Sequence, residues 1–478
     1  MSAVLEDIAA RIRALLPTQA DWSVRLVDDY EQHLHVWRSV SQPPAWQQRR
    51  GAFISCNENG SLAYAATSDL TDTGLRLAYA RARQLARQLQ ARQLFPCPAG
   101  IGPRQHGHYK TTVKQPWASR EFRDLSDWLQ RLNSSLHQHQ AIVDWSAALT
   151  WRHTDMLLIG PDAMVKQAFD FISPHLSASA CRHNETQTRS FGYDHAAQAG
   201  LEHLDKLDLD NAATRIGTEA VELLDADDCP DTCCDLLLMP GQMILQIHES
   251  IGHPLELDRI LGDERNYAGS SFVSFDMFGH YQYGSELLNV VFDPHHPGEL
   301  ASYAFDDSGS VARREYLIRD GILTRPLGSA MSQQRAGLAG VANARSSGWN
   351  RPPIDRMANI NIEPGNQSLA DMISGIEYGV LMDTNRSWSI DDRRNKFQFG
   401  CEYGRMIVAG ELRGLVKNPN YRGISASFWR NLHAVGNAET FAVHGVHTCG
   451  KGEPNQALHA GHAAPACVFK NIAVFGGD

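Results

Sequence analysis

The chain has 478 residues, of which 43% are hydrophobic and 21% are charged, a composition typical of a globular protein with more than one domain. A net charge of −10 argues against a nucleic-acid backbone as the main partner, and no apolar run approaches the length of a membrane span. The first residues carry acids where a signal peptide carries bases, so we expect a cytoplasmic protein. Nine scattered cysteines, an odd number, argue against a disulfide framework.

The first half alternates between helical and strand patterns. Apolar residues at helical spacing predict helices over residues 4–16, 73–94, 119–136 and 208–224. Ser119 is the expected N-cap of the third helix, and Asp208 or Asp210 that of the fourth. Strand patterns lie at residues 22–27, 52–55, 62–65 and within 142–190. Asn59-Gly60 predicts a hairpin between the second and third of these strand patterns.

The second half is mostly β in pattern after one short helix. A buried strand is expected over residues 236–239, then a helix over 242–252. Hairpins are expected within 316–324 and 406–412, a helix over 368–379, and a final strand over 467–475.

These patterns predict an α+β protein of two domains. Residues 1–229 form an N-terminal α/β domain, with long helices over strands. The order helix, strands, helix occurs twice in it, so an internal duplication with a break near 95–117 is an alternative. Residues 230–478 form a C-terminal domain whose mostly antiparallel, barrel-like sheet surrounds the helix over 242–252.

The most informative stretch is the His-Glu-x-x-x-His segment that runs from His248 to His253. Imidazole nitrogen suits zinc, and the carboxylate of Glu249 can take a proton from a water molecule that the metal activates. Two ordinary histidines near a helix end are the alternative interpretation.

The five-residue spacing sets the two histidines roughly 140° apart on a regular helix. A π-bulge between His248 and His253 would bring both side chains to one metal. Alternatively, the helix ends at Gly252, because Pro254 biases His253 away from helical angles.

A catalytic zinc takes three protein ligands, so a third one is needed. The candidates are Glu256, Asp258, Glu264, Cys449, His459 and His462. Cys449 lies in a loop of small residues that allows close approach to a ligand, and Lys451 would help to hold a thiolate. His459 and His462 are three residues apart and could themselves bind metal, although a surface loop is the favoured interpretation of that pair.

From Leu236 to the C-terminus, the chain resembles the TldD/PmbA family of peptidases. The segments that carry the resemblance are Leu245–His253, Phe305–Gly309, Arg356–Asn359, Ile376–Gly379, Thr448–Lys451 and Asn471–Gly477. Their order and rough spacing match the family over the whole second half, and the His-Glu segment points to its metal-binding, TldD-like branch.

This resemblance implies His248, His253 and Cys449 as zinc ligands and Glu249 as the general base. It also implies a PmbA-like partner subunit or a homodimer. The chain departs from the family after His253, where Pro254–Asp258 reads Pro-Leu-Glu-Leu-Asp instead of Gly-Leu-Glu-Gly-Asp.

The function expected from these observations is a zinc-dependent peptidase that hydrolyses unfolded or extended peptides, which the resemblance suggests are held by strand addition. Two alternatives remain open. One is a non-catalytic binding or regulatory subunit, in which His447, His459 or Glu256 supplies a fourth ligand to a structural metal. The other is a metal-dependent amidohydrolase that acts on a small molecule. No nucleic acid or membrane partner is expected.

Overall fold

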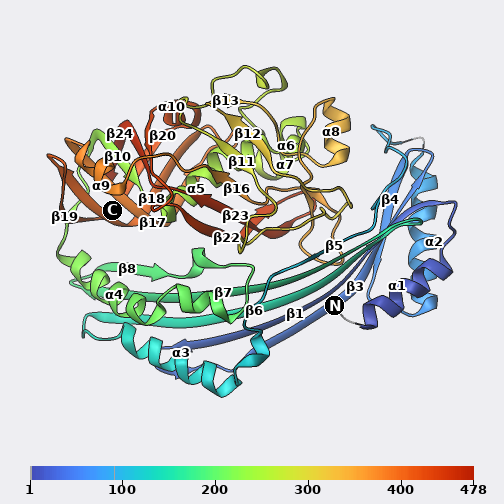
Figure 1. Cartoon of the computed structure of the whole chain (residues 1–478), viewed down its shortest axis with the longest axis horizontal. Coiled ribbons are helices and arrows are strands. Elements are labelled where there is room, and N and C mark those ends of the chain that lie inside the picture. Colours follow the sequence, from blue (N-terminus) through green and yellow to red (C-terminus); the bar gives the residue numbers. More distant parts are fainter. Residues whose placement is uncertain (1–2, 91, 478) are drawn as a thin grey trace.

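The computed structural model describes residues 3–90 and 92–477, and it shows two units that face each other (Figure 1). The first unit is built on a long, curved sheet of eight strands with the order β4-β3-β1-β6-β7-β5, in which β2 pairs with β1 and β8 with β7. All pairs are antiparallel except β5 with β7. The strands are β1 (Asp21–Trp37), β2 (Val40–Ser41), β3 (Ala45–Glu58), β4 (Ser61–Thr67), β5 (Gly107–Lys110), β6 (Ile142–Ile159), β7 (Met164–Arg182) and β8 (Glu185–Phe191).

Four helices cover the outer side of this sheet. They are α1 (Ala3–Leu15), α2 (Asp72–Leu89), α3 (Phe122–Leu136) and α4 (Leu209–Glu222). In Figure 1, α3 lies below the long strands and α4 crosses their left part, while α1 and α2 lie at the far end of the sheet. The leucines of α3 and the apolar side chains of α4 pack on one apolar cluster, and those of α1 and α2 on another. The sheet therefore has one face covered by its own helices and one face left for the second unit.

The expected elements of this unit are present with shifted ends. The helix predicted to reach Leu94 ends at Leu89, and residue 91 of that prediction lies outside the described residues. Ser119 is not the N-cap of α3, because it belongs to a 3-10 turn and Glu121 takes that place. Asp208 is the N-cap of α4, as one of the two alternatives proposed.

The second unit contains a closed barrel of five strands, which confirms the α+β class and the barrel-like sheet. The ring runs β17-β10-β24-β20-β18 and closes by pairing of β18 with β17. Only the pair of β10 and β17 is parallel. The strands are β10 (Thr232–Leu238), β17 (Tyr378–Ile390), β18 (Lys396–Val408), β20 (Pro419–Ile424) and β24 (Cys467–Gly476).

Helix α5 (Pro240–Ile247) shares the core of this barrel. Gln242 Nε2 donates to the hydroxyl of Tyr421 on β20, and that hydroxyl donates to Gln246 Oε1, each over 3.0 Å. A buried chain of polar groups thus fixes the rotation of α5 about its own axis. The expected arrangement, a barrel-like sheet around this helix, is present.

Smaller elements surround the barrel. The additional strands are β9 (Asp227–Asp228), β11 (Val290–Phe292), β12 (Glu315–Arg319), β13 (Ile322–Leu323), β14 (Ala344–Arg345), β15 (Ile354–Asp355), β16 (Ile360–Ile362), β19 (Glu411–Lys417), β21 (Leu432–Val435), β22 (Ala442–Lys451) and β23 (Gln456–Ala464). The short helices are α6 (Leu257–Leu261), α7 (Arg265–Ala268), α8 (Ala330–Ala336), α9 (Leu369–Ser374) and α10 (Ser425–Arg430). Both hairpins expected here are present, as β12–β13 and β18–β19. The helix expected over 368–379 is shorter, because β17 begins at Tyr378.

The second unit packs on the inner face of the first sheet. Gln167 Nε2 on β7 donates to Phe305 O over 2.9 Å, and Arg25 Nη2 on β1 donates to Gly348 O over 2.7 Å. The division of the chain at residues 229 and 230, and an internal duplication in the first unit, stay predictions. Over the described residues, none of the helices combines the length and the apolar character that a membrane crossing requires.

Candidate metal centre

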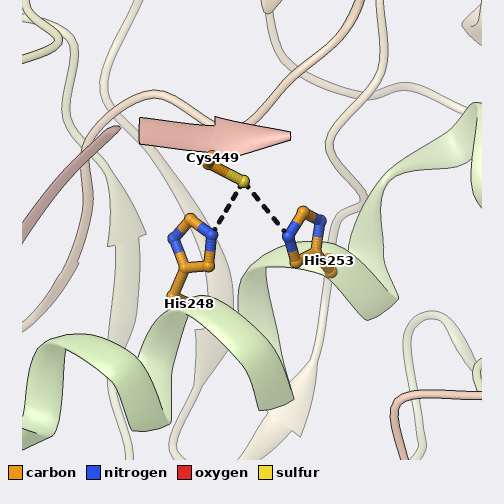
Figure 2. Close-up of side chains that lie close together, drawn as sticks. All are labelled: His248, His253 and Cys449. Atoms are coloured by element: carbon orange, nitrogen blue, oxygen red, sulfur yellow. Dashed lines mark hydrogen bonds between the residues drawn. The ribbon is translucent and has the colours of Figure 1, made fainter. Parts of the chain in front are cut away.

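The two histidines of the His-Glu segment are brought together by a π-helical turn. This turn covers His248–Gly252 at the end of α5, and the N–H of His253 donates to His248 O, five residues back. The wider turn absorbs the extra residue of the motif, so both side chains point the same way (Figure 2). The π-bulge, the first of the two ways in which the two histidines were expected to come together, is therefore present.

The second route, in which Pro254 moves His253 out of helical angles, is wrong. His253 has φ −59° and ψ −42°, and it opens a 3-10 turn that contains Pro254. Gly252 is needed in the π-turn, because a Cβ atom there would lie 2.6 Å from Met357 Sδ. Tyr283 donates to the carbonyl oxygen of Ser250, and Trp429 Nε1 donates to Ser250 Oγ over 2.9 Å. These bonds satisfy polar groups of the turn.

Cys449 reaches the histidines from β22, close to the other end of the second unit's sequence (Figure 2). Its Sγ lies 3.0 Å from His248 Nε2 and 3.3 Å from His253 Nε2, and all three residues are buried. Donors bound to one tetrahedral zinc ion lie about 3.5 Å apart. Two imidazoles and one thiolate at these separations fit a single transition-metal ion with little movement.

The charges around this cluster favour its metal-binding protonation states. Burial lowers the pKa of His248 to about 4, so its imidazole is neutral at pH 7. Burial alone would raise the pKa of Cys449, but Arg356 and His253 outweigh it and lower that pKa. Arg356 Nη2 also donates to Cys449 O over 3.0 Å. Arg356 thus has the thiolate-stabilising place that the sequence suggested for Lys451.

The outer nitrogen of His248 is held by His462. His462 Nδ1 donates to Ile360 O over 3.2 Å, because a carbonyl can only accept. Burial keeps the pKa of His462 well below its ordinary value, so its Nε2 carries no proton and accepts from His248 Nδ1 over 2.8 Å. The lone pair of His248 Nε2 therefore points at the cluster.

The outer nitrogen of His253 is held by Glu256. His253 Nδ1 donates to Glu256 Oε2 over 2.9 Å, and Met357 N donates to Glu256 Oε1 over 3.0 Å. Although burial opposes it, the charges of Lys451 and His253 hold the pKa of Glu256 well below its usual range. Lys451 Nζ lies 3.1 Å from Glu256 Oε2 and 2.6 Å from Asp258 Oδ1. Glu256 therefore holds His253 in place even though the chain departs from the family's sequence pattern at Pro254.

The other ligand candidates lie outside the cluster. Glu256 and His462 contact the two histidines from behind, Asp258 pairs with Lys451, and Glu264 Oε2 pairs with Arg259 Nη2 over 2.7 Å. His459 is not in a surface loop, because it lies on β23 with its ring centroid 4.8 Å from that of Phe171.

Glu249 is buried on the π-turn beside His248. Its Oε2 pairs with Arg394 Nη1, from the turn between β17 and β18. Burial would raise the pKa of Glu249, but the nearby His253 ring and the Arg394 guanidinium outweigh it and lower that pKa. Glu249 therefore carries a negative charge near neutral pH. Arg394 has no recognisable motif around it, so sequence reasoning could not find it, whereas Arg356 lies in a segment that carries the family resemblance.

A cavity of about 280 Å³ lies between the first sheet and β22–β23. Thr448, the neighbour of Cys449, lines it together with His447, Phe171 and Arg152. A hollow with apolar and charged walls therefore lies at the interface of the two units, lined by the chain neighbour of Cys449 but by none of His248, Glu249, His253 and Cys449.

Comparison with known proteins agrees with the resemblance. A metalloprotease of Methanothermobacter thermautotrophicus is 29% identical over 353 residues, which cover 73% of this chain and 74% of that protein. A protein of Saccharolobus solfataricus named as a zinc metalloprotease TldD homolog is 26% identical over 202 residues, which cover 42% of each chain.

Solved structures share the fold over nearly the whole chain. A Thermotoga maritima protein named as a proposed modulator of DNA gyrase aligns with a TM-score of 0.75 at 15% identity, covering 98% of this chain and 100% of that one. TldE of Thermococcus kodakarensis aligns with a TM-score of 0.69 at 14% identity, covering 99% and 100%. Residues 232–476 match the family described as the PmbA/TldA metallopeptidase C-terminal domain, so the chain belongs to that metallopeptidase family.

Proposed function

We propose that this chain is a zinc-dependent peptidase that hydrolyses unfolded or extended peptides. The observation that carries the proposal is the convergence of His248 Nε2, His253 Nε2 and Cys449 Sγ next to a buried, ionised Glu249. Two imidazoles and a thiolate suit zinc, and three protein ligands leave one position open for chemistry. When bound there, zinc would polarise the scissile carbonyl and make a water molecule more acidic.

In this proposal, Glu249 is the general base. Arg394 holds Oε2 of the carboxylate, which leaves Oε1 to take the proton from the attacking water and pass it to the leaving amine. The Arg394 charge also keeps the carboxylate ionised before water attacks. Arg394 is therefore a positioning residue, because it acts through Glu249.

The strand β22, which carries Cys449 and also lines the cavity between the two units, supports a peptide as the substrate. Over the part of the chain that the structure describes, β22 pairs with β23 alone. Its second edge offers backbone groups to an extended peptide, as strand addition requires. Thr448 and His447 on β22 also line the cavity, which would receive side chains of the same peptide.

The arrangement favours a catalytic over a structural metal. A structural zinc site is usually closed by a fourth protein ligand. Both carboxylate oxygens of Glu256 are occupied by His253 Nδ1 and Met357 N, and His447 and His459 line the cavity. The side chains that could supply a fourth ligand are therefore engaged away from the three donor atoms.

Removal and return of the metal test the function. We expect zinc chelation to abolish cleavage of an unstructured polypeptide and stoichiometric zinc to restore it. Turnover should be at least about tenfold lower on small amides than on the polypeptide, because a small amide forms none of the strand contacts that position a peptide. Cleavage of small amides alone would favour the amidohydrolase, and a zinc-loaded protein that cleaves neither would favour the binding subunit.

We expect His462→Phe to weaken zinc binding by about 10- to 100-fold, because His248 then loses the acceptor for its Nδ1 proton. Competition with a chromophoric chelator measures this affinity. His459→Phe is the matched control, since His459 lies on the same strand without contact to a ligand, and its affinity should stay within about twofold. Equal affinities of the two variants would contradict the assigned orientation of His248.

A PmbA-like subunit or a second copy of this chain as partner, and a cytoplasmic location, belong to the same proposal. Support for the partner comes from the shared fold with TldE.

A further inference from the structure

A second group of metal-ligating side chains lies where the two units meet. Asp194 and His195 come from the 3-10 turn Tyr193–His195 after β8, and His444 comes from the start of β22. Asp194 Oδ1 lies 2.8 Å from His195 Nδ1, and Asp194 Oδ2 lies 3.3 Å from His444 Nδ1. A donor atom from each of the three residues lies within 4.8 Å of the other two. The separations match the 3.0 and 3.3 Å found between Cys449 and its histidines.

His444 has a ring nitrogen without a hydrogen bond, although that atom lies within ion-pair distance of Asp194. It is only 5% exposed, and its Nδ1 is buried without a hydrogen bond among the described residues. The atom faces Asp194 Oδ2, but the contact lacks hydrogen-bond geometry. A buried polar atom without a hydrogen bond destabilises the fold, so a ligand that binds it would be stabilising.

A second carboxylate converges on the same place from β17. A Cβ atom on Gly241 would lie 2.5 Å from Asp383 Oδ1 and 3.5 Å from Asp194 Oδ2, so both acids face the first turn of α5. A divalent cation would relieve the repulsion between the two carboxylates.

We propose that Asp194, His195 and His444 bind a second zinc ion, with Asp383 as the adjacent carboxylate. Two imidazoles with carboxylate oxygens are a donor set that zinc accepts. The site is separate from the first, because His444 precedes Cys449 by five residues, about 16 Å along an extended strand. It would tie the first unit to β22, the strand that carries Cys449, and through Asp383 to β17.

Zinc counting on the full chain tests this site without any activity measurement. After zinc loading and removal of excess metal, we expect two zinc ions per wild-type chain. We expect one in the His253→Ala, Cys449→Ala double variant and one in His444→Gln. With all three substitutions, no tightly bound zinc should remain. A single zinc in the wild-type chain, or none in the double variant, would overturn the proposal.

Cobalt(II) tells which site is filled in each variant. The thiolate of Cys449 gives a charge-transfer band in the near ultraviolet, which imidazole and carboxylate ligands do not give. His444→Gln should keep this band at full strength while it loses one cobalt ion, and loss of the band instead would contradict the assignment. This variant tests the second site even if the triple variant fails to fold, because its first site is unchanged.

His175→Gln is the matched control. His175 also has a buried Nδ1 without a hydrogen bond, and its ring centroid lies 5.8 Å from that of Tyr193, next to the cluster. We expect this variant to retain two zinc ions. Loss of one zinc there as well as in His444→Gln would show a general sensitivity of the region and would overturn the assignment of His444 as a ligand.

Discussion

Glu249→Gln should lower kcat for peptide hydrolysis by about 100- to 10,000-fold while zinc stays bound, because an amide cannot take the proton of the attacking water. The amide has the same shape as the carboxylate and can still contact Arg394 through its oxygen. His248, His253 and Cys449 are unchanged by this substitution. Initial rates on an unstructured polypeptide, measured with zinc content on the same sample, give both quantities.

Glu264→Gln is the matched control for Glu249→Gln. Glu264 is also a buried glutamate paired with an arginine, Arg259, but it lies away from the three donor atoms. Activity of this control should stay within about threefold of wild type, since the change removes a charge without touching the reacting groups. Full activity in Glu249→Gln would remove the general-base role and leave the zinc site without an assigned base.

Cys449→Ala should weaken zinc binding at the first site by more than about 100-fold, because loss of a direct ligand exceeds the 10- to 100-fold effect of losing an outer hydrogen bond. Peptidase activity should fall with zinc occupancy. The affinity should also become less dependent on pH, since the variant has no thiol proton to release when metal binds. Competitive titration with a chelator at several pH values measures both effects.

Cys401→Ala is the control for thiol loss. Cys401 is a buried cysteine on β18, and burial raises its pKa well above the ordinary value, so it stays a neutral thiol. Its removal should leave zinc affinity unchanged within about twofold. Wild-type affinity in Cys449→Ala would break the three-ligand arrangement, and the site would then need a donor from elsewhere.

The site is unusual for the number of charges that it buries together. Lys451, Glu256 and Arg356 are almost fully buried, and each has an opposite charge nearby. Removal of one partner from such a group leaves an unpaired buried charge and is strongly destabilising. Variants of these residues would therefore report folding as well as catalysis. Glu249→Gln and its control Glu264→Gln also change buried ion pairs, so their thermal unfolding is measured beside activity.

Local sequence patterns were sufficient for most of the elements around the site. The turn residues Asn59-Gly60 and Asp320-Gly321 predicted hairpins that the structure contains, because positive φ angles select such residues. Periodicity placed α1 within one residue at each end. Helix ends were less accurate. Ser119 has the side chain of an N-cap, but a 3-10 turn after Pro116 uses it and moves the start of α3 to Phe122.

By itself, the sequence determined the list of residues with the chemistry for a metal site, and family resemblance reduced that list to His248, His253 and Cys449. Their roles stay a proposal, but the tertiary structure decided which of them can meet. It showed a π-turn rather than a helix end at Pro254, because close packing of Gly252 on Met357 and the bonds to Ser250 are non-local. It likewise turned Glu256 and His462 toward the outer nitrogens of the histidines. His462 comes from a distant strand, and Glu256, although only three residues from His253, is held in place by the distant Met357 N.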